Sequence, residues 1–123
     1  MNNPRIYEIK KEQKESLLFK EISGLLLRAS IDDPNLSGLS VIRAKLSPDK
    51  SVCLVYIYTA NGLDEYKKKL DTLKLYKPSL RKAVSKAIKG RYVPDIKFQF
   101  DEQFEKQNKI EELFEKLKKE GQL

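Results

Sequence analysis

Apolar side chains in the first quarter of the chain recur at the spacing of a helix. Between residues 4 and 29 they are separated by three or four positions, which places them on one helix face. These residues are Leu18, Ile22, Leu25, Leu26 and Ala29. The segment DDPNLSG, residues 32–38, ends the predicted helix, because the residue before a proline avoids helical angles and Asn, Ser and Gly favour turns.

Two segments with β-strand character follow. Residues 39–47 and 51–59 are rich in β-branched and aromatic side chains, and the turn sequence SPDK connects them. The first segment alternates, with Arg43 and Lys45 on its polar side, whereas the second is apolar on both sides. This pattern predicts a β-hairpin whose second strand lies inside a sheet.

A proline divides the next helical region into two. Pro78 lacks a backbone donor and clashes with the preceding turn, so it breaks or kinks a helix. Gly90 suits the end of the second helix. The apolar stripe before the proline is Leu63, Tyr66, Leu70 and Leu73, and the stripe after it is Leu80, Ala83, Val84, Ala87 and Ile88.

A last strand and a last helix complete the pattern. Residues 95–100, DIKFQF, place Ile96, Phe98 and Phe100 on one side, as a half-buried strand does. The residues after them form an amphipathic helix that ends near Gly121. Its stripe contains Phe104, Ile110, Leu113, Phe114 and Leu117. We expect the later part of this stripe to dock on the domain, with capture of a partner as the alternative; it comprises Ile110, Leu113, Phe114 and Leu117.

These elements predict an α+β fold in the order α-β-β-α-kink-α-β, followed by a C-terminal helical tail. Helices must cover one face of the three-stranded sheet to bury the apolar stripes. At 123 residues the chain has room for one domain. We expect residues 1–102 to form that domain and residues 103–123 to form the tail.

The composition excludes most routes to catalysis. The chain has no histidine and one cysteine, so it lacks the usual general base, Ser-His and Cys-His pairs and most zinc sites. Cys53 belongs to the apolar strand and behaves there as a small apolar side chain. Close acidic residues fall at turns and helix starts, where caps are the ordinary role. We therefore expect no enzymatic activity, no cofactor and no metal.

No segment has the length or hydrophobicity of a membrane span, and the first residues lack the apolar core of a signal peptide. A single cysteine suits a reducing compartment. We expect a cytoplasmic protein without membrane contact.

Positive charge is concentrated in one part of the chain. Residues 61–91 hold ten basic residues against three acidic ones, a net of +7, which equals the net charge of the whole chain. A concentrated basic segment is typical of a surface that binds a polyanion. The candidate RNA-binding residues are Lys67, Lys68, Lys74, Lys77, Arg81, Lys82, Lys86, Lys89 and Arg91.

Other interpretations of these residues stay open. The basic helix face is equally typical of a solvated surface or of a module that binds an acidic protein. A carboxylate-dependent nuclease would need clustered acids that the sequence does not offer. Arg43 and Lys45 fit protection of a strand edge better than RNA binding. For Tyr56, Tyr58 and Tyr92 we expect packing, although Tyr56 and Tyr58 also suit base stacking.

Four segments resemble one protein family. They are KEISGLLLRASIDDPNLSGLSV (20–41), AKLSPDKSVCLVYIY (44–58), LRKAVSKAIKGRYVPDIKFQFDE (80–102) and NKIEELFEKL (108–117). In this order they resemble the ribosome-binding factor A family, with RYVPDIKF as the most specific piece. The resemblance implies a type II KH-like fold, in which the Gly-x-x-Gly loop of true KH domains is replaced by a kink, here at Tyr76, Lys77 and Pro78.

The resemblance also implies a function. It implies a non-catalytic factor that associates with free or immature 30S subunits, binds 16S rRNA and supports late 30S maturation, including processing of the 16S rRNA 5′ end. We expect a monomer with no small-molecule substrate.

Overall fold

The computed structural model describes residues 4–88 and 92–121. The helices and strands follow one another in the predicted order, with one short 3-10 helix added. The elements are α1 (Pro4–Asp32), η1 (Pro34–Leu36), β1 (Leu39–Leu46), β2 (Val52–Thr59), α2 (Leu63–Leu75), α3 (Lys77–Ala87), β3 (Asp95–Phe100) and α4 (Glu102–Lys119). None of the helices in this part of the chain combines the length and hydrophobicity that a membrane crossing requires.

The three strands form one sheet in the order β1-β2-β3. β1 and β2 are antiparallel, as a hairpin requires, and β2 and β3 are parallel. A parallel pair needs a long crossover, which α2 and α3 supply between β2 and β3. The predicted α+β fold, with β2 inside a three-stranded sheet, is confirmed.

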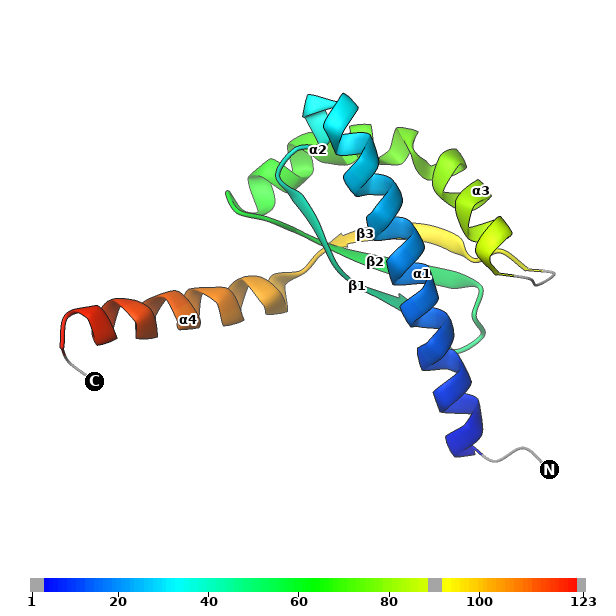
Figure 1. Ribbon diagram of the computed structural model, residues 1–123, viewed down its shortest axis with the longest axis horizontal. Coiled ribbons are helices and arrows are strands. Elements are labelled where there is room, and N and C mark those ends of the chain that lie inside the picture. Colours follow the sequence, from blue (N-terminus) through cyan, green and yellow to red (C-terminus); the bar gives the residue numbers. More distant parts are fainter. Residues whose placement is uncertain (1–3, 89–91, 122–123) are drawn as a thin grey trace.

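One face of the sheet carries the hydrophobic core. Cys53, Val55 and Ile57 of β2 are fully buried on this face, against buried leucines and isoleucines of α1, α2 and α3. Figure 1 shows α2 and α3 above the strands and α1 crossing them, while α4 projects away from the body. The alternate residues of β2 are only half-buried, because α1, α2 and α3 lie on the core face and α4 reaches the opposite face only at Tyr58.

The break between α2 and α3 falls at Tyr76, inside the predicted segment. α2 ends at Leu75, and Pro78 lies in the first turn of α3, where its missing N–H costs no hydrogen bond. The Tyr76 hydroxyl donates a hydrogen bond of 2.8 Å to Asp33 Oδ2 and so ties the junction to the end of α1. The negative Asp33 partner of this bond raises the pKa of the Tyr76 hydroxyl.

The hairpin turn is closed by one carboxylate. Asp49 Oδ1 accepts hydrogen bonds from the hydroxyls of Ser47 and Ser51, both at 2.7 Å, and from the Ser51 amide at 3.0 Å. These bonds lower the pKa of Asp49 to about 2. The prediction that paired acids at turns serve as caps therefore fits the contacts of Asp49.

Predictions around the end of α3 are wrong or fall outside the described residues. Tyr92 is 80% exposed and lies ahead of β3, so it does not anchor the last strand. The second helix ends at Ala87, earlier than predicted, and Gly90 lies outside the described residues.

The predicted docking of the α4 stripe is wrong. Ile110, Leu113 and Phe114 are each more than half exposed. α4 contacts the domain through its first two turns, where the Phe104 ring packs edge-on against Tyr58 at 4.9 Å and Asn108 donates to the Tyr58 hydroxyl at 3.1 Å. The predicted division of the chain at residue 102 stays a prediction.

Burial of Cys53 leads to a testable expectation. Burial, and secondarily the negative charge of Glu15, raises the pKa of its thiol to about 11. At pH 8 only about one thousandth of the thiol is then ionised, and no reagent reaches it. We expect the native protein to resist a thiol-specific chromogenic disulfide at pH 8 and to react stoichiometrically in guanidinium. Because the chain has one cysteine, rapid labelling of the native state would contradict its burial.

Candidate nucleic-acid interface

α3 presents its basic residues on the side away from the core. Leu80 and Val84 are fully buried against the sheet and α1, which fixes the orientation of the helix. Arg81, Lys82 and Lys86 lie on the opposite side and are exposed. An exposed ammonium or guanidinium group reaches a phosphate without losing much hydration first, so this face suits a polyanion.

A shallow groove runs between α3 and α1. It has a volume of about 510 Å³ and small residues of α3 along it, among them Ser79 and Ala83. Lys82 and Lys86 line the groove from α3, and Glu21 lines it from α1. Two cations against one carboxylate leave the groove positive, and the small side chains let a backbone of a partner approach α3 closely.

α2 carries a second group of exposed lysines. Lys67, Lys68 and Lys74 are exposed, as their place on the polar side of the helix predicts. Lys69 differs from them, because its ammonium pairs with Glu65 at 3.1 Å and donates to the Ser37 carbonyl. Lys69 therefore joins α2 to the loop before β1.

The remaining predicted residues are Lys77, Lys89 and Arg91. Lys77 is half-buried, with its ammonium 5.8 Å from the centre of the Phe98 ring in a cation–π arrangement. Lys89 and Arg91 lie outside the described residues. The structure thus brings the predicted residues of α2 and α3 onto two consecutive exposed helix faces, one on each side of the Tyr76 break.

The sequence pattern predicted one of two tyrosine positions. Tyr58 packs against the core cluster and the Phe104 ring, as expected, whereas Tyr56 is half-buried on the open face of the sheet. Arg43 stacks on the Tyr56 ring, with its Cζ atom 4.2 Å from the ring centre. The number of strands could have predicted this position, because a three-stranded sheet with helices on one side leaves the other side of its middle strand open.

The described residues contain no group of three or more His, Cys, Asp or Glu side chains placed to hold a metal ion. The acidic residues that the sequence brings close together act locally instead. Asp33 caps η1 through the Asn35 amide at 3.0 Å, and Asp101 caps α4 through the Phe104 amide at 3.0 Å.

Comparison with known proteins decides the family. Residues 10–114 match the family model described as ribosome-binding factor A. The chain belongs to the ribosome-binding factor A family. Ribosome-binding factor A of Brevibacillus brevis is 30% identical over 122 residues, which cover 99% of this chain and 96% of that protein. Members of this family are assembly factors rather than enzymes, so the expectation of a non-enzymatic protein is confirmed.

The crystal structure of one relative confirms the fold that the resemblance implied. The crystal structure of ribosome-binding factor A from Thermus thermophilus superposes with a TM-score of 0.60 at 25% identity, over 72% of this chain and 93% of that one. A homology model of the Thermus thermophilus factor, fitted into the cryo-EM map of a 30S–RbfA complex, covers 67% of this chain and 89% of its own, with a TM-score of 0.48 at 25% identity.

Proposed function

We propose that this chain binds the small ribosomal subunit and contacts 16S rRNA through the exposed basic faces of α2 and α3. The observation that carries the proposal is the exposure of Arg81, Lys82 and Lys86 on a helix whose other side is fixed in the core. Membership of a family of ribosome-binding factors supports the ribosome as the target. The Thermus thermophilus relative, with the same fold, supports the 30S subunit.

Charge favours the helical faces over the rest of the surface as the main contact. Residues 61–91 hold the whole net charge of the chain, and the described basic residues among them, apart from Lys69 and Lys77, are exposed. Each lysine or arginine that meets a phosphate releases a condensed counterion, so affinity falls steeply as salt rises. Binding through these faces is consequently salt-dependent.

The kink decides how RNA is recognised. True KH domains clamp single strands with a Gly-x-x-Gly loop between two helices. Here Tyr76 occupies the junction, its hydroxyl is bonded to Asp33, and Pro78 follows in the first turn of α3. A junction built this way offers no glycine amides to a nucleic-acid backbone. The helical faces therefore recognise folded rRNA by its phosphate positions. In this proposal the chain is a monomer and supports late 30S maturation, including 16S rRNA 5′-end processing.

Sedimentation tests the proposal directly. Cell extract is separated on a sucrose gradient in low-salt magnesium buffer, and the fractions are probed for the chain. We expect it with free 30S subunits, released to the top of the gradient in high salt because the contacts are electrostatic. Finding it only at the top of the gradient in low salt would contradict ribosome binding. The alternative is an acidic protein partner. In that case the chain would sediment at the same position in the gradient after the ribosomes are removed.

A further inference from the structure

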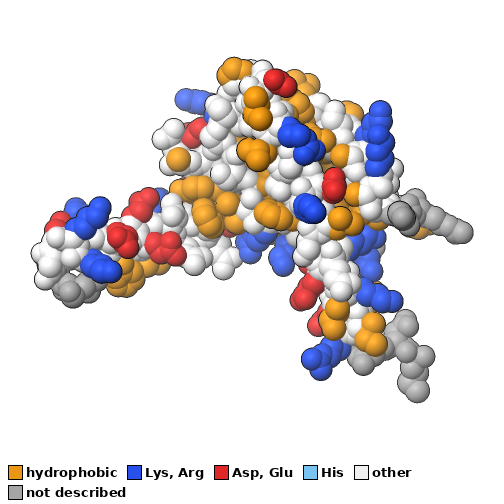
Figure 2. Space-filling view, viewed as in Figure 1, with side chains coloured by type: hydrophobic (Ala, Val, Ile, Leu, Met, Phe, Trp, Pro, Cys, Tyr) orange, Lys and Arg blue, Asp and Glu red, His pale blue; other side chains and the backbone are white. Residues whose placement is uncertain are grey.

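The face of the sheet away from the helices is open and carries three cations. In β1 this face presents Arg43 and Lys45, and in β3 it presents Lys97. Lys45 and Lys97 are exposed, and the Arg43 side chain is 37% exposed. Asp95 supplies one acidic side chain at the end of the same face, and Glu15 of α1 pairs with the Lys45 ammonium at 3.9 Å from the edge of β1. Figure 2 shows Lys and Arg side chains gathered beneath the body, between α4 and the first half of α1.

The register of the strands orders these side chains in two rows. Arg43, Tyr56 and Gln99 are neighbours across the sheet, and Lys45, Leu54 and Lys97 form the next row. Side chains two residues apart on a strand lie on the same face, so the two rows are adjacent. A lysine therefore stands on each side of Leu54, beside the row that holds the stacked Arg43–Tyr56 pair.

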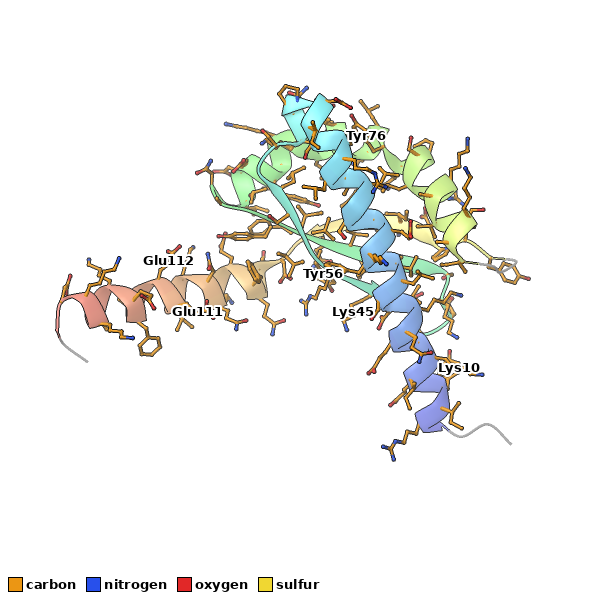
Figure 3. The ribbon with its side chains drawn as sticks, viewed as in Figure 1. Lys10, Lys45, Tyr56, Tyr76, Glu111 and Glu112 are labelled. Carbon is orange, nitrogen blue, oxygen red and sulfur yellow. The ribbon has the colours of Figure 1, made fainter. Side chains whose placement is uncertain are left out.

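Arg43 is held over the Tyr56 ring by contacts with the start of α4. Its Nε lies 3.3 Å from Asp101 Oδ2, and its Nη2 donates to Gln103 Oε1 at 3.2 Å. Asp101 is itself 2% exposed and caps α4, so it has little freedom to move. The guanidinium plane is thus positioned in advance, with Tyr56 beneath it. Figure 3 shows Tyr56 and Lys45 on the side of the sheet away from α2 and α3.

We propose that this open face is a second RNA-binding surface, on which an unpaired base stacks over the Arg43–Tyr56 pair and the neighbouring phosphates contact Lys45 and Lys97. Bases of single strands stack on aromatic rings and on arginine planes, and the chemistry needs only a flat, accessible platform flanked by cations. The ligand class is single-stranded RNA, since paired bases have no free face to offer. The proposal adds a surface to the helical faces and stands on separate residues.

A second copy of the chain fits this face poorly. A two-fold dimer through the face would bring Lys45 and Lys97 of one copy against the cations of the other, because an isologous interface pairs the same patch with itself. α4 covers only the Tyr58 end of the face with its first turns, and the rest of the helix projects outward. A polyanion with flat rings satisfies both the charges and the stack.

The test compares single-stranded with double-stranded RNA on the full-length chain. A fluorescein-labelled decauridylate and a blunt duplex of the same length are titrated with protein, and anisotropy gives the affinities. We expect Tyr56→Leu to weaken the single strand by about tenfold, the usual effect of losing one stacked base. Tyr56→Phe keeps the ring beneath Arg43 and is expected to bind as the original chain does. Duplex affinity is expected to stay unchanged in both variants.

A lysine pair tests the phosphate contacts without touching the packing of the sheet. Lys45→Gln/Lys97→Gln removes two exposed cations, and we expect the slope of log affinity against log salt for the single strand to fall by about 1.4. The same measurements in a Lys82→Glu/Lys86→Glu background separate the two surfaces. Loss of the stacking effect there would overturn the second surface, whereas its persistence supports it whatever becomes of the helical faces.

Three results would overturn the proposal. One is unchanged decauridylate binding by both Tyr56→Leu and the lysine pair. Another is an equal loss of duplex and single-strand binding in Tyr56→Leu, which would show that no free base is needed. The third is concentration-dependent self-association of the original chain that Lys45→Gln/Lys97→Gln abolishes, which would make the face an interface between copies. Thermal unfolding checks that each variant is folded. If Tyr56→Leu does not fold, the Lys45→Gln/Lys97→Gln variant still tests the proposal.

Discussion

Reversing two charges on α3 is expected to weaken 30S binding by about a hundredfold. Lys82→Glu/Lys86→Glu removes two exposed cations that line the groove between α3 and α1 and adds two anions beside Glu21. Each charge-assisted contact with a phosphate contributes roughly 1.5–3 kcal/mol, so losing two accounts for the expected change even before repulsion is counted. The measurement is co-sedimentation of purified chain with salt-washed 30S subunits across a titration.

A matched reversal elsewhere controls for net charge. Lys10→Glu/Lys11→Glu changes the total charge equally, but it lies on the part of α1 that projects beyond the sheet, where Figure 3 labels Lys10. We expect this control to lose only a few-fold in affinity, through weaker long-range attraction. Equal losses in the two double variants would mean that binding follows net charge and that α3 makes no specific contact. Retained affinity in the α3 variant would show that the basic face of α3 does not contact the 30S subunit.

Removing the Asp101 carboxylate is expected to lower the free energy of unfolding by about 2 kcal/mol. Asp101 is 2% exposed and has two roles, because it accepts from the Phe104 amide as the cap of α4 and pairs with Arg43 at 3.3 Å. Losing a cap costs about 1 kcal/mol. The ion pair adds about as much, since Asp101 is buried while the partner side chain is 37% exposed and partly screened by water. Chemical denaturation of Asp101→Ala measures the sum.

Two further substitutions divide that effect. Asp101→Asn keeps an oxygen that accepts from Phe104 while removing the charge that faces Arg43, so we expect about half the loss. Glu102→Ala changes the exposed neighbouring residue and is expected to cost less than about 0.5 kcal/mol. Asp101→Ala with unchanged stability would show that the cap and the ion pair add nothing to the fold. A stable Asp101→Ala chain with less helix would show that α4 unfolds separately.

The fold was largely predictable because each apolar stripe has one way to be buried. Leu18 and Ile22 of α1, and Leu80 and Val84 of α3, recur at helical spacing, and all four are buried in the core as expected. β3 was predicted at its observed bounds, because DIKFQF alternates strictly and follows a proline. The break at Tyr76 was predictable from Pro78, since a proline two residues into a helix forces the preceding turn to end.

The candidate site was predictable only as far as helix faces are. Arg81, Lys82 and Lys86 fall opposite the stripe of α3, so their exposure followed from periodicity. The hydrogen bond from Lys69 to the Ser37 carbonyl did not follow from periodicity, because the two residues are far apart in the chain. The carboxylate that holds Arg43 was equally invisible, since Asp101 and Arg43 meet across the sheet.

The sequence by itself determined which elements form, which side of each is apolar, and where the positive charge gathers. These properties follow from local spacing, which a helix or strand converts directly into a face. Only the tertiary structure decided that one face of β2 stays open, that Tyr56 lies there beneath Arg43, and that the stripe of α4 is exposed. The reason is that an apolar side chain is buried only where another element covers it. Coverage depends on how many helices reach each side of the sheet, and here α1, α2 and α3 all pack on the same one.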